Sequence, residues 1–145
     1  MIRTRVLALC CAAIIAALYV VALVSGTEVR HVVQTAPVWA GVILGWRRNK
    51  WAGWLALPIF LFWLAAMVMI WLFLLGWARV ISGHFSPAEV AMTIVIGAAS
   101  VAGIGAAVRT PENLSKIGVA GLFFLGAALQ FAAFRVSLLP GIATR

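Results

Sequence analysis

Acidic residues are scarce in this chain, which has no aspartate and only three glutamates among its 145 residues. The sequence also lacks H-E-x-x-H, G-x-S-x-G and a glycine-rich phosphate-binding loop, the patterns that hold metals, nucleophiles or phosphates in common hydrolases and nucleotide-binding proteins. These absences argue against hydrolysis through a metal or a covalent intermediate. We therefore expect a protein that is not an enzyme.

Cysteine and charge are scarce as well. The two cysteines, Cys10 and Cys11, are adjacent. Neighbouring residues of one helix point about 100° apart and are not easily bridged, so we expect two small apolar side chains instead of a disulfide. Charged residues make up 10% of the chain, and the net charge of +8 comes from basic residues that never form a run of five. This scatter indicates contacts with lipid headgroups and argues against nucleic acid as a partner.

Apolar sequence is what the chain has in abundance, with 66% hydrophobic residues and a mean hydropathy of +1.15. The stretches 6–24, 51–78 and 90–108 each contain no charged side chain. Each is long enough to cross a membrane, because about 20 apolar helical residues span a hydrocarbon layer of about 30 Å. We therefore predict an all-α fold, a polytopic membrane helix bundle in which residues 1–145 form a single membrane domain. The five predicted spans are 6–24, 28–46, 51–78, 88–108 and 117–134.

Two of these spans have an alternative interpretation. The run 6–24 follows two arginines, as in a secretory signal peptide, but the apolar region of a signal peptide usually has about 7 to 15 residues. Because this run is longer than that, we favour an uncleaved helix. Segment 28–46 contains Gln34 and Pro37, and its uncharged part, 32–46, is short for a span, so the segment could instead be re-entrant. Extending the helix back to Glu28 makes it as long as the first span, and we favour a full crossing.

Short patterns mark the helix ends. Gly26 suits the end of the first helix, because glycine readily adopts the left-handed conformation found there. Ser25 with Glu28, and Ser86 with Glu89, have the three-residue spacing of a capping box. We expect each pair to begin a helix.

The positions of Lys and Arg predict which way the chain crosses the membrane. With a cytoplasmic N-terminus, seven basic residues lie inside and four outside, as the positive-inside rule requires. The inner ones are Arg3, Arg5, Arg47, Arg48, Lys50, Arg109 and Lys116, and the outer ones are Arg30, Arg79, Arg135 and Arg145. We therefore predict a cytoplasmic N-terminus and a C-terminus outside. The compact chain and its arginine-rich basic residues favour the inner membrane of a bacterial cell.

Helix packing in a bilayer depends on small residues, because lipid tails are as apolar as the helix surfaces themselves. Two sets of small residues are candidates: Ala99, Ser100, Gly103 and Ala107 in the fourth span, and Gly118, Gly121 and Gly126 in the fifth. The short turn between these spans predicts that they pack against each other. The alternative is a homodimer through the same residues, and a larger membrane complex is the other expected partner.

The third span carries eight of the sixteen aromatic residues. Those at its ends, among them Trp51 and Trp77, are typical of an aromatic belt at the membrane interface. Pro58 is the expected kink in this long span. Four residues at helical spacing mark one face in mid-membrane: Phe60, Trp63, Met67 and Trp71. We expect this face to contact lipid or the bundle core, and the alternative is a wall for a flat ligand such as a quinone or carotenoid.

The candidate ligand-binding site is a group of polar residues that the predicted topology places in the outer half of the membrane. Polar residues in membrane spans are costly and often functional when they face the protein interior. The members are Glu28, Arg30, His31, Gln34, His84, Glu89 and Gln130. The structural alternatives are helix capping for the glutamates, solvation for the histidines and an interfacial position for the arginine.

We expect no cofactor, and the alternative is a haem or a quinone at this site. No metal site is predicted, because two histidines and two glutamates without a standard spacing do not form a zinc site. The sequence therefore favours a small multi-pass integral membrane protein that serves as a non-enzymatic accessory or assembly subunit through helix packing. An outer-facing small-molecule, quinone or haem binding module and a homo-oligomeric transporter or channel are the alternatives. All three glutamates lie at span ends, which argues against a small proton-coupled exporter.

Overall fold

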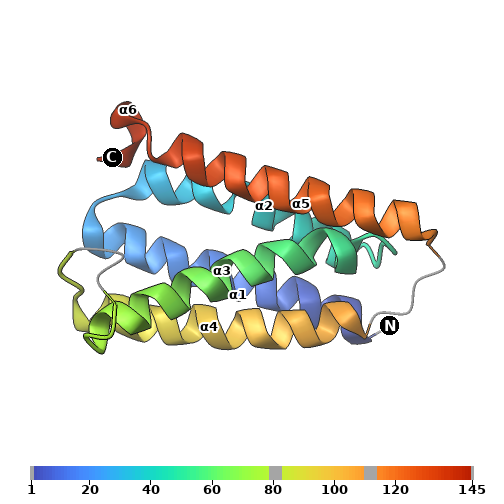
Figure 1. The fold of residues 1–145 in the computed structure, drawn as a ribbon, viewed down its shortest axis with the longest axis horizontal. Coiled ribbons are helices and arrows are strands. Elements are labelled where there is room, and N and C mark those ends of the chain that lie inside the picture. Colours follow the sequence, from blue (N-terminus) through green and yellow to red (C-terminus); the bar gives the residue numbers. More distant parts are fainter. Residues whose placement is uncertain (1, 79–82, 110–113, 145) are drawn as a thin grey trace.

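The computed structural model describes residues 2–78, 83–109 and 114–144, and every regular element in these ranges is an α-helix (Figure 1). This confirms the predicted all-α helical membrane bundle. Arg79 and Arg145, which contributed to the predicted orientation, lie outside the described residues. The helices are α1 (Ile2–Ser25), α2 (Glu28–Trp46), α3 (Ala52–Leu74), α4 (Pro87–Val108), α5 (Lys116–Ser137) and α6 (Pro140–Ala143).

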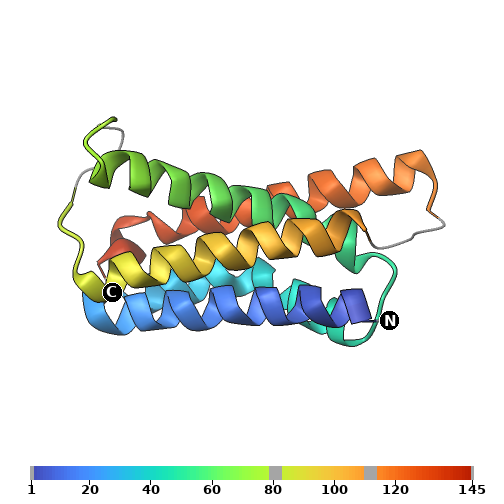
Figure 2. The ribbon, with the colours of Figure 1, turned by 90° about the horizontal axis from the view of Figure 1, so that it is seen from below.

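The five long helices lie side by side in alternating directions, so the chain begins at one end of the bundle and finishes at the other (Figures 1 and 2). Helix α1 packs against α2 and α4, α3 packs against α4 and α5, and α5 also packs against α2. The buried apolar core includes Leu7 and Ile14 of α1 and Phe60 of α3, each fully buried. Cleavage of the first helix would therefore remove part of the core.

The predicted pairing of the fourth and fifth spans is wrong. Within the described residues, α4 and α5 make no contact with each other. Helix α4 instead packs against aromatic side chains of α3. The ring of Phe60 lies over Gly103, and the ring of Trp71 lies over Gly97. The glycines of α4 therefore make room for large side chains of a different neighbour.

The predicted third span is too long at its C-terminal end. Helix α3 continues through Pro58 but ends at Leu74, although the apolar run extends to Ala78. Gly76 has a φ of +74°, which allows the chain to leave the helix in a left-handed turn. Gly26, with a φ of +65°, follows the end of α1 in the same way, as the sequence predicts.

One of the two predicted capping boxes is present. The Ser86 backbone N–H donates to Glu89 Oε2 at 2.7 Å, and the Glu89 N–H donates to Ser86 Oγ at 3.2 Å. The box predicted for Ser25 and Glu28 is wrong, because α2 has Thr27 at its N-cap position and no side-chain cap there. The Ser25 hydroxyl instead donates to a carbonyl in the last turn of α1, at 2.8 Å.

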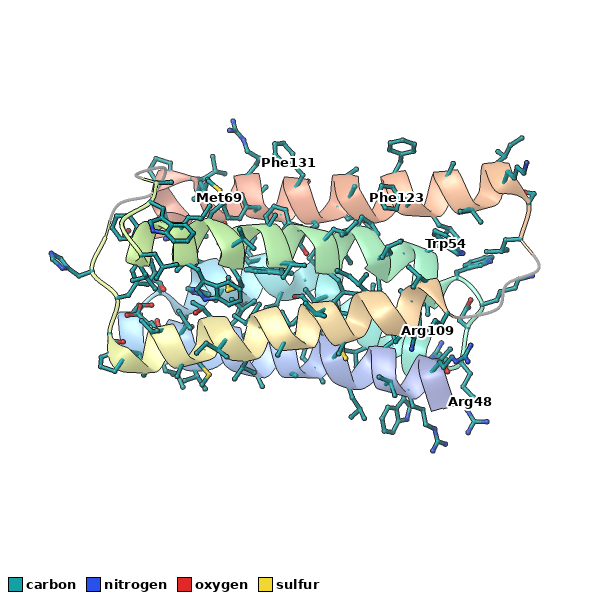
Figure 3. All side chains as sticks on the ribbon, turned by 60° about the horizontal axis from the view of Figure 1, so that its bottom comes forward. Arg48, Trp54, Met69, Arg109, Phe123 and Phe131 are labelled. Carbon is teal, nitrogen blue, oxygen red and sulfur yellow. The ribbon has the colours of Figure 1, made fainter. Side chains whose placement is uncertain are left out.

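In the described part of the chain, four helices are long and apolar enough to cross a membrane: Arg3–Ser25, Ala52–Leu74, Pro87–Val108 and Lys116–Ser137. Tryptophans flank helix α3 at both ends. Trp51 is 46% exposed and Trp77 is 77% exposed. Figure 3 shows Trp54 near one end of the bundle and Met69 toward the other. The exposed tryptophans at both ends of α3 match the predicted aromatic belt.

Helix α2 is less apolar than these four, yet it runs unbroken through Pro37 along the bundle. Gly45, in its last turn, lies against Ala8 near the start of α1, so α2 reaches the end of the bundle at which the chain begins. The segment therefore does not turn back on itself, which argues against the re-entrant alternative.

The side chains of α2 are arranged with polar groups inside and apolar groups outside. Gln34 and Thr35 are buried, whereas Val32, Trp39 and Ile43 are exposed. A helix surrounded by water favours the reverse arrangement, but an apolar outer surface suits lipid, and inward polar groups can bond to other helices. The polar residues in the middle of α2 that lower its hydropathy thus face the bundle interior, whereas Glu28, in its first turn, is exposed.

Candidate functional site

Three buried polar side chains connect α2 with α5. Gln34 Nε2 donates to Ser137 Oγ at 3.0 Å, and Gln130 Nε2 donates to the backbone carbonyl of Gln34 at 3.2 Å. Ser137 Oγ in turn donates to the Phe134 carbonyl at 2.6 Å. Gln34 and Gln130 belong to the predicted site and are brought together by the fold. Ser137 was missed, because a serine near a helix end carries no distinctive pattern.

The other residues of the predicted cluster differ in exposure and in their contacts. His84 and Glu28 are exposed, and Glu89 is used in the capping box at the start of α4. His31 is buried, and its Nδ1 atom donates to the Thr27 carbonyl at 2.9 Å. Glu89 and His84 therefore have the capping and solvated positions that the sequence offered as alternatives to ligand binding. Glu28 is exposed without capping α2, and His31 is buried instead of solvated.

A second polar contact joins α1 with α2 and was not predicted. Thr35 Oγ1 lies 3.3 Å from the hydroxyl oxygen of Tyr19 and 3.0 Å from the carbonyl oxygen of Val32. The indole N–H of Trp39 donates to the same Tyr19 hydroxyl at 3.4 Å. Tyr19 is the chain's only tyrosine, so its position in an apolar span was the signal that could have indicated this contact.

Several buried polar atoms in the described part of the chain have no hydrogen-bond partner. They are Arg30 Nε, Trp63 Nε1, Ser100 Oγ and Gln130 Oε1. Trp71 differs from Trp63, because its indole N–H donates to Thr93 Oγ1 at 2.9 Å. The predicted aromatic face of α3 thus belongs to the bundle core, where Phe60, Trp63 and Met67 are at most 4% exposed.

The small residues predicted for helix packing fall into two groups. Ala99, Ser100, Gly103 and Ala107 of α4 are all buried. Of the three glycines of α5, only Gly126 is buried. A Cβ atom there would overlap the Leu55 carbonyl oxygen and lie 2.9 Å from Pro58 Cγ, whereas a Cβ atom at Gly121 would meet nothing within 4 Å. Helix α5 therefore approaches the backbone of α3 at one glycine.

Beside this contact lies a groove of about 620 Å³ between α3 and α5. Its wall on α3 includes Pro58 and Phe62, and Phe62 also packs edge to face on Phe134, with ring centroids 5.3 Å apart. Figure 3 shows two of its residues, Phe123 and Phe131, along α5. The lining consists of Pro58, Leu61, Phe62, Phe123, Phe124, Ala127, Ala128 and Phe131, without a polar side chain. The groove thus offers shape and apolar contact but no side-chain hydrogen bond or metal ligand.

Among the described residues, no group of three or more His, Cys, Asp or Glu side chains could hold a metal ion. The chain matches no family model, no curated protein and no solved structure. The geometry of the bundle and its groove is therefore the basis for a functional proposal.

Proposed function

We propose that this protein is a non-enzymatic accessory or assembly subunit of a membrane complex. It acts by packing a transmembrane helix of its partner into the groove between α3 and α5. The observation that carries this proposal is a groove of about 620 Å³ with an entirely apolar lining, on a helix that buries only Gly126, Gln130 and Ser137.

A helix fits this groove because its lining combines small and aromatic residues. Apolar surface alone gives no net attraction between helices in lipid, so association requires close packing. Ala127 and Ala128 leave room for another helix to approach, and Phe124 and Phe131, which are 70% and 59% exposed, can pack around it. In the isolated subunit these aromatic rings face lipid.

The quinone or haem alternative has less support. A quinone needs hydrogen-bond donors for its carbonyl oxygens, and a haem iron needs an axial ligand such as histidine. The groove supplies neither from its side chains. In the predicted outer site, Gln34 is bonded to Ser137 and Gln130 to Gln34.

We infer the orientation of the bundle in the membrane from the difference in charge between its two ends. We call the end at which α1 begins the basic end. Its described charged residues are Arg3, Arg5, Arg47, Arg48, Lys50, Arg109 and Lys116, all positive. Among the described residues of the opposite end, Glu28 and Glu89 balance Arg30 and Arg135. Positively charged loops are retained in the cytoplasm, so we propose a bacterial inner membrane with the basic end inside.

Filling the groove tests the proposed function. Replacement of Ala128, an exposed residue of the groove, by tryptophan is expected to reduce assembly with the partner roughly tenfold or more, because overfilling a packed site costs about 1 to 3 kcal/mol. The measurement is the fraction of protein in a large particle on native gels after extraction in mild detergent.

The matched control is Ala98→Trp, which makes the same change at an exposed alanine on α4. It is expected to assemble like the wild type. Equal assembly of both variants, or a wild-type protein that runs as an isolated subunit, would contradict the proposed function. A purified wild-type particle that carries a pigment or quinone would support the ligand-binding alternative instead.

A further inference from the structure

A second groove, of about 350 Å³, lies between α1 and α4 at the basic end. Figure 3 shows Arg109 at this end of the bundle, together with Arg48. One part of the lining is cationic, because it includes an arginine from each helix, and the remainder is apolar. The lining residues are Arg3, Val6, Ala102, Gly105, Ala106 and Arg109.

The two arginines are brought together by a hydrogen bond. Arg3 Nη1 donates to the backbone carbonyl of Arg109, the residue that caps the C-terminus of α4. A guanidinium group has five N–H donors, so this bond leaves most donors of Arg3 available. Arg109 lines the same groove, so a second guanidinium group belongs to the lining. Two positively charged residues in one groove favour an anion there, because an anion offsets their mutual repulsion.

Acidic residues do not supply that anion in the described part of the basic end. The seven charged residues described there are all Lys or Arg, and the nearest described glutamates belong to the opposite end of the bundle. Glu112 lies outside the described residues. Charge complementarity with the described residues of the groove favours an anionic ligand. A planar guanidinium recognises a phosphate group well, because two of its N–H groups can bind two phosphate oxygens in parallel.

We propose that this groove binds an anionic phospholipid. The phosphate lies between Arg3 and Arg109, and an acyl chain follows the apolar part of the groove along Val6 and Gly105. A lipid accounts for both parts of the lining, whereas a free phosphate accounts only for the arginines. This site is separate from the α3–α5 groove, so the lipid proposal does not depend on the proposed function.

Helix capping is the simpler explanation for Arg3, because a cation near a helix C-terminus interacts favourably with the helix dipole. Capping alone predicts that loss of Arg3 lowers stability without changing which lipids bind. Lipid recognition predicts a change in selectivity, and it also predicts that the apolar part of the groove matters. The two explanations are therefore distinguished by binding measurements on charge variants and on a variant that changes only the groove shape.

The test is native mass spectrometry of the full-length protein in detergent, titrated with phosphatidylglycerol or phosphatidylcholine. Loss of one basic side chain that contacts the anionic headgroup is expected to weaken lipid binding roughly fivefold. We therefore expect Arg3→Gln with Arg109→Gln to weaken phosphatidylglycerol binding roughly 25-fold, with phosphatidylcholine unaffected. Arg5→Gln, which removes a charge at the same end but outside the groove, is expected to remain within about twofold of the wild type.

Two further measurements keep the proposal falsifiable if the double variant does not fold. Gly105→Leu is expected to weaken phosphatidylglycerol binding several-fold without a charge change, because a Cβ atom at Gly105 meets nothing within 4 Å and the side chain can occupy the groove. Inorganic phosphate is expected not to displace the lipid. Unchanged phosphatidylglycerol binding in the double variant or in Gly105→Leu would overturn the proposal. Displacement by inorganic phosphate would show a simple anion site instead.

Discussion

Gly126→Leu is expected to lower the stability of the bundle by roughly 2 to 3 kcal/mol, since overfilling a packed contact costs about this much. A Cβ atom at Gly126 would overlap the Leu55 carbonyl oxygen, which belongs to the backbone of α3 and cannot rotate away. Helix α5 would have to move from α3, which would also strain the bond between Gln130 and Gln34. The measurement is unfolding in mixed micelles followed by tryptophan fluorescence.

Gly121→Leu is the matched control on the same helix. A Cβ atom at Gly121 meets nothing within 4 Å, so we expect a change within about 0.5 kcal/mol, as for most surface substitutions. Both variants gain the same helix propensity, and the difference between them therefore reports packing alone. If the two variants unfold alike, or if Gly121→Leu is the more damaging, α5 does not pack against α3 through Gly126.

Gly103→Leu is expected to be similarly severe, with a loss of about 3 kcal/mol, because the substituted side chain must compete with a buried aromatic ring. A Cβ atom at Gly103 would lie 2.5 Å from the ring of Phe60, which is fully buried and has no free space to enter. Gly105→Leu, two residues further along α4, is the control and is expected to remain close to the wild type in detergent without added lipid. Unfolding in mixed micelles compares the two.

A double variant checks that Phe60 is the cause. Phe60→Ala alone removes a core ring and is expected to cost about 3 kcal/mol or more. Combined with Gly103→Leu, the two losses are expected to be less than additive by about 1 kcal/mol, because the leucine side chain fills part of the space left by the ring. Strict additivity would show that Phe60 and Gly103 do not touch.

The helices and their approximate ends could be predicted from the sequence because both depend on local features. Apolar runs of sufficient length mark four helices, and Ser86 with Glu89 marks the start of α4 through a bond between residues three apart. The end of α3 was missed for a reason that is also local. Gly76 ends the helix through its backbone conformation while the apolar sequence continues, so hydropathy alone misplaces the boundary.

The choice of neighbours could not be predicted, because it depends on which large side chain fits which glycine. A small-residue face on α4 is compatible with any partner, and proximity in the chain favoured α5. The structure pairs Gly103 with Phe60 and Gly126 with Leu55, contacts between residues far apart in the sequence. Sequence spacing identifies a surface that can be approached closely, but the approaching residue is decided by the shape of the whole bundle.

Helix geometry explains why only some of the predicted site residues in α2 are buried. Residues three positions apart are separated by about 300° around the helix axis, which is about 60° short of a full turn. Each side chain in such a series therefore points about 60° away from the previous one. His31 and Gln34 therefore still point inward, while Glu28, one step earlier, is exposed. The bond from Gln130 to Gln34 joins residues 96 positions apart, and no local pattern indicates it.

The most direct test of a membrane bundle with α2 as a full crossing is cysteine labelling in spheroplasts with a maleimide that cannot cross the membrane. Single cysteines are introduced at connections and near the C-terminus, and the native Cys10 and Cys11, which are buried, are left in place. The positions are Thr27, Asn49, His84, Ser115 and Thr144. We predict labelling of Thr27, His84 and Thr144 variants in intact spheroplasts, and of Asn49 and Ser115 variants only after permeabilisation. Labelling of the Thr27 and Asn49 variants from the same side would contradict the crossing of α2 and the five-span bundle with it.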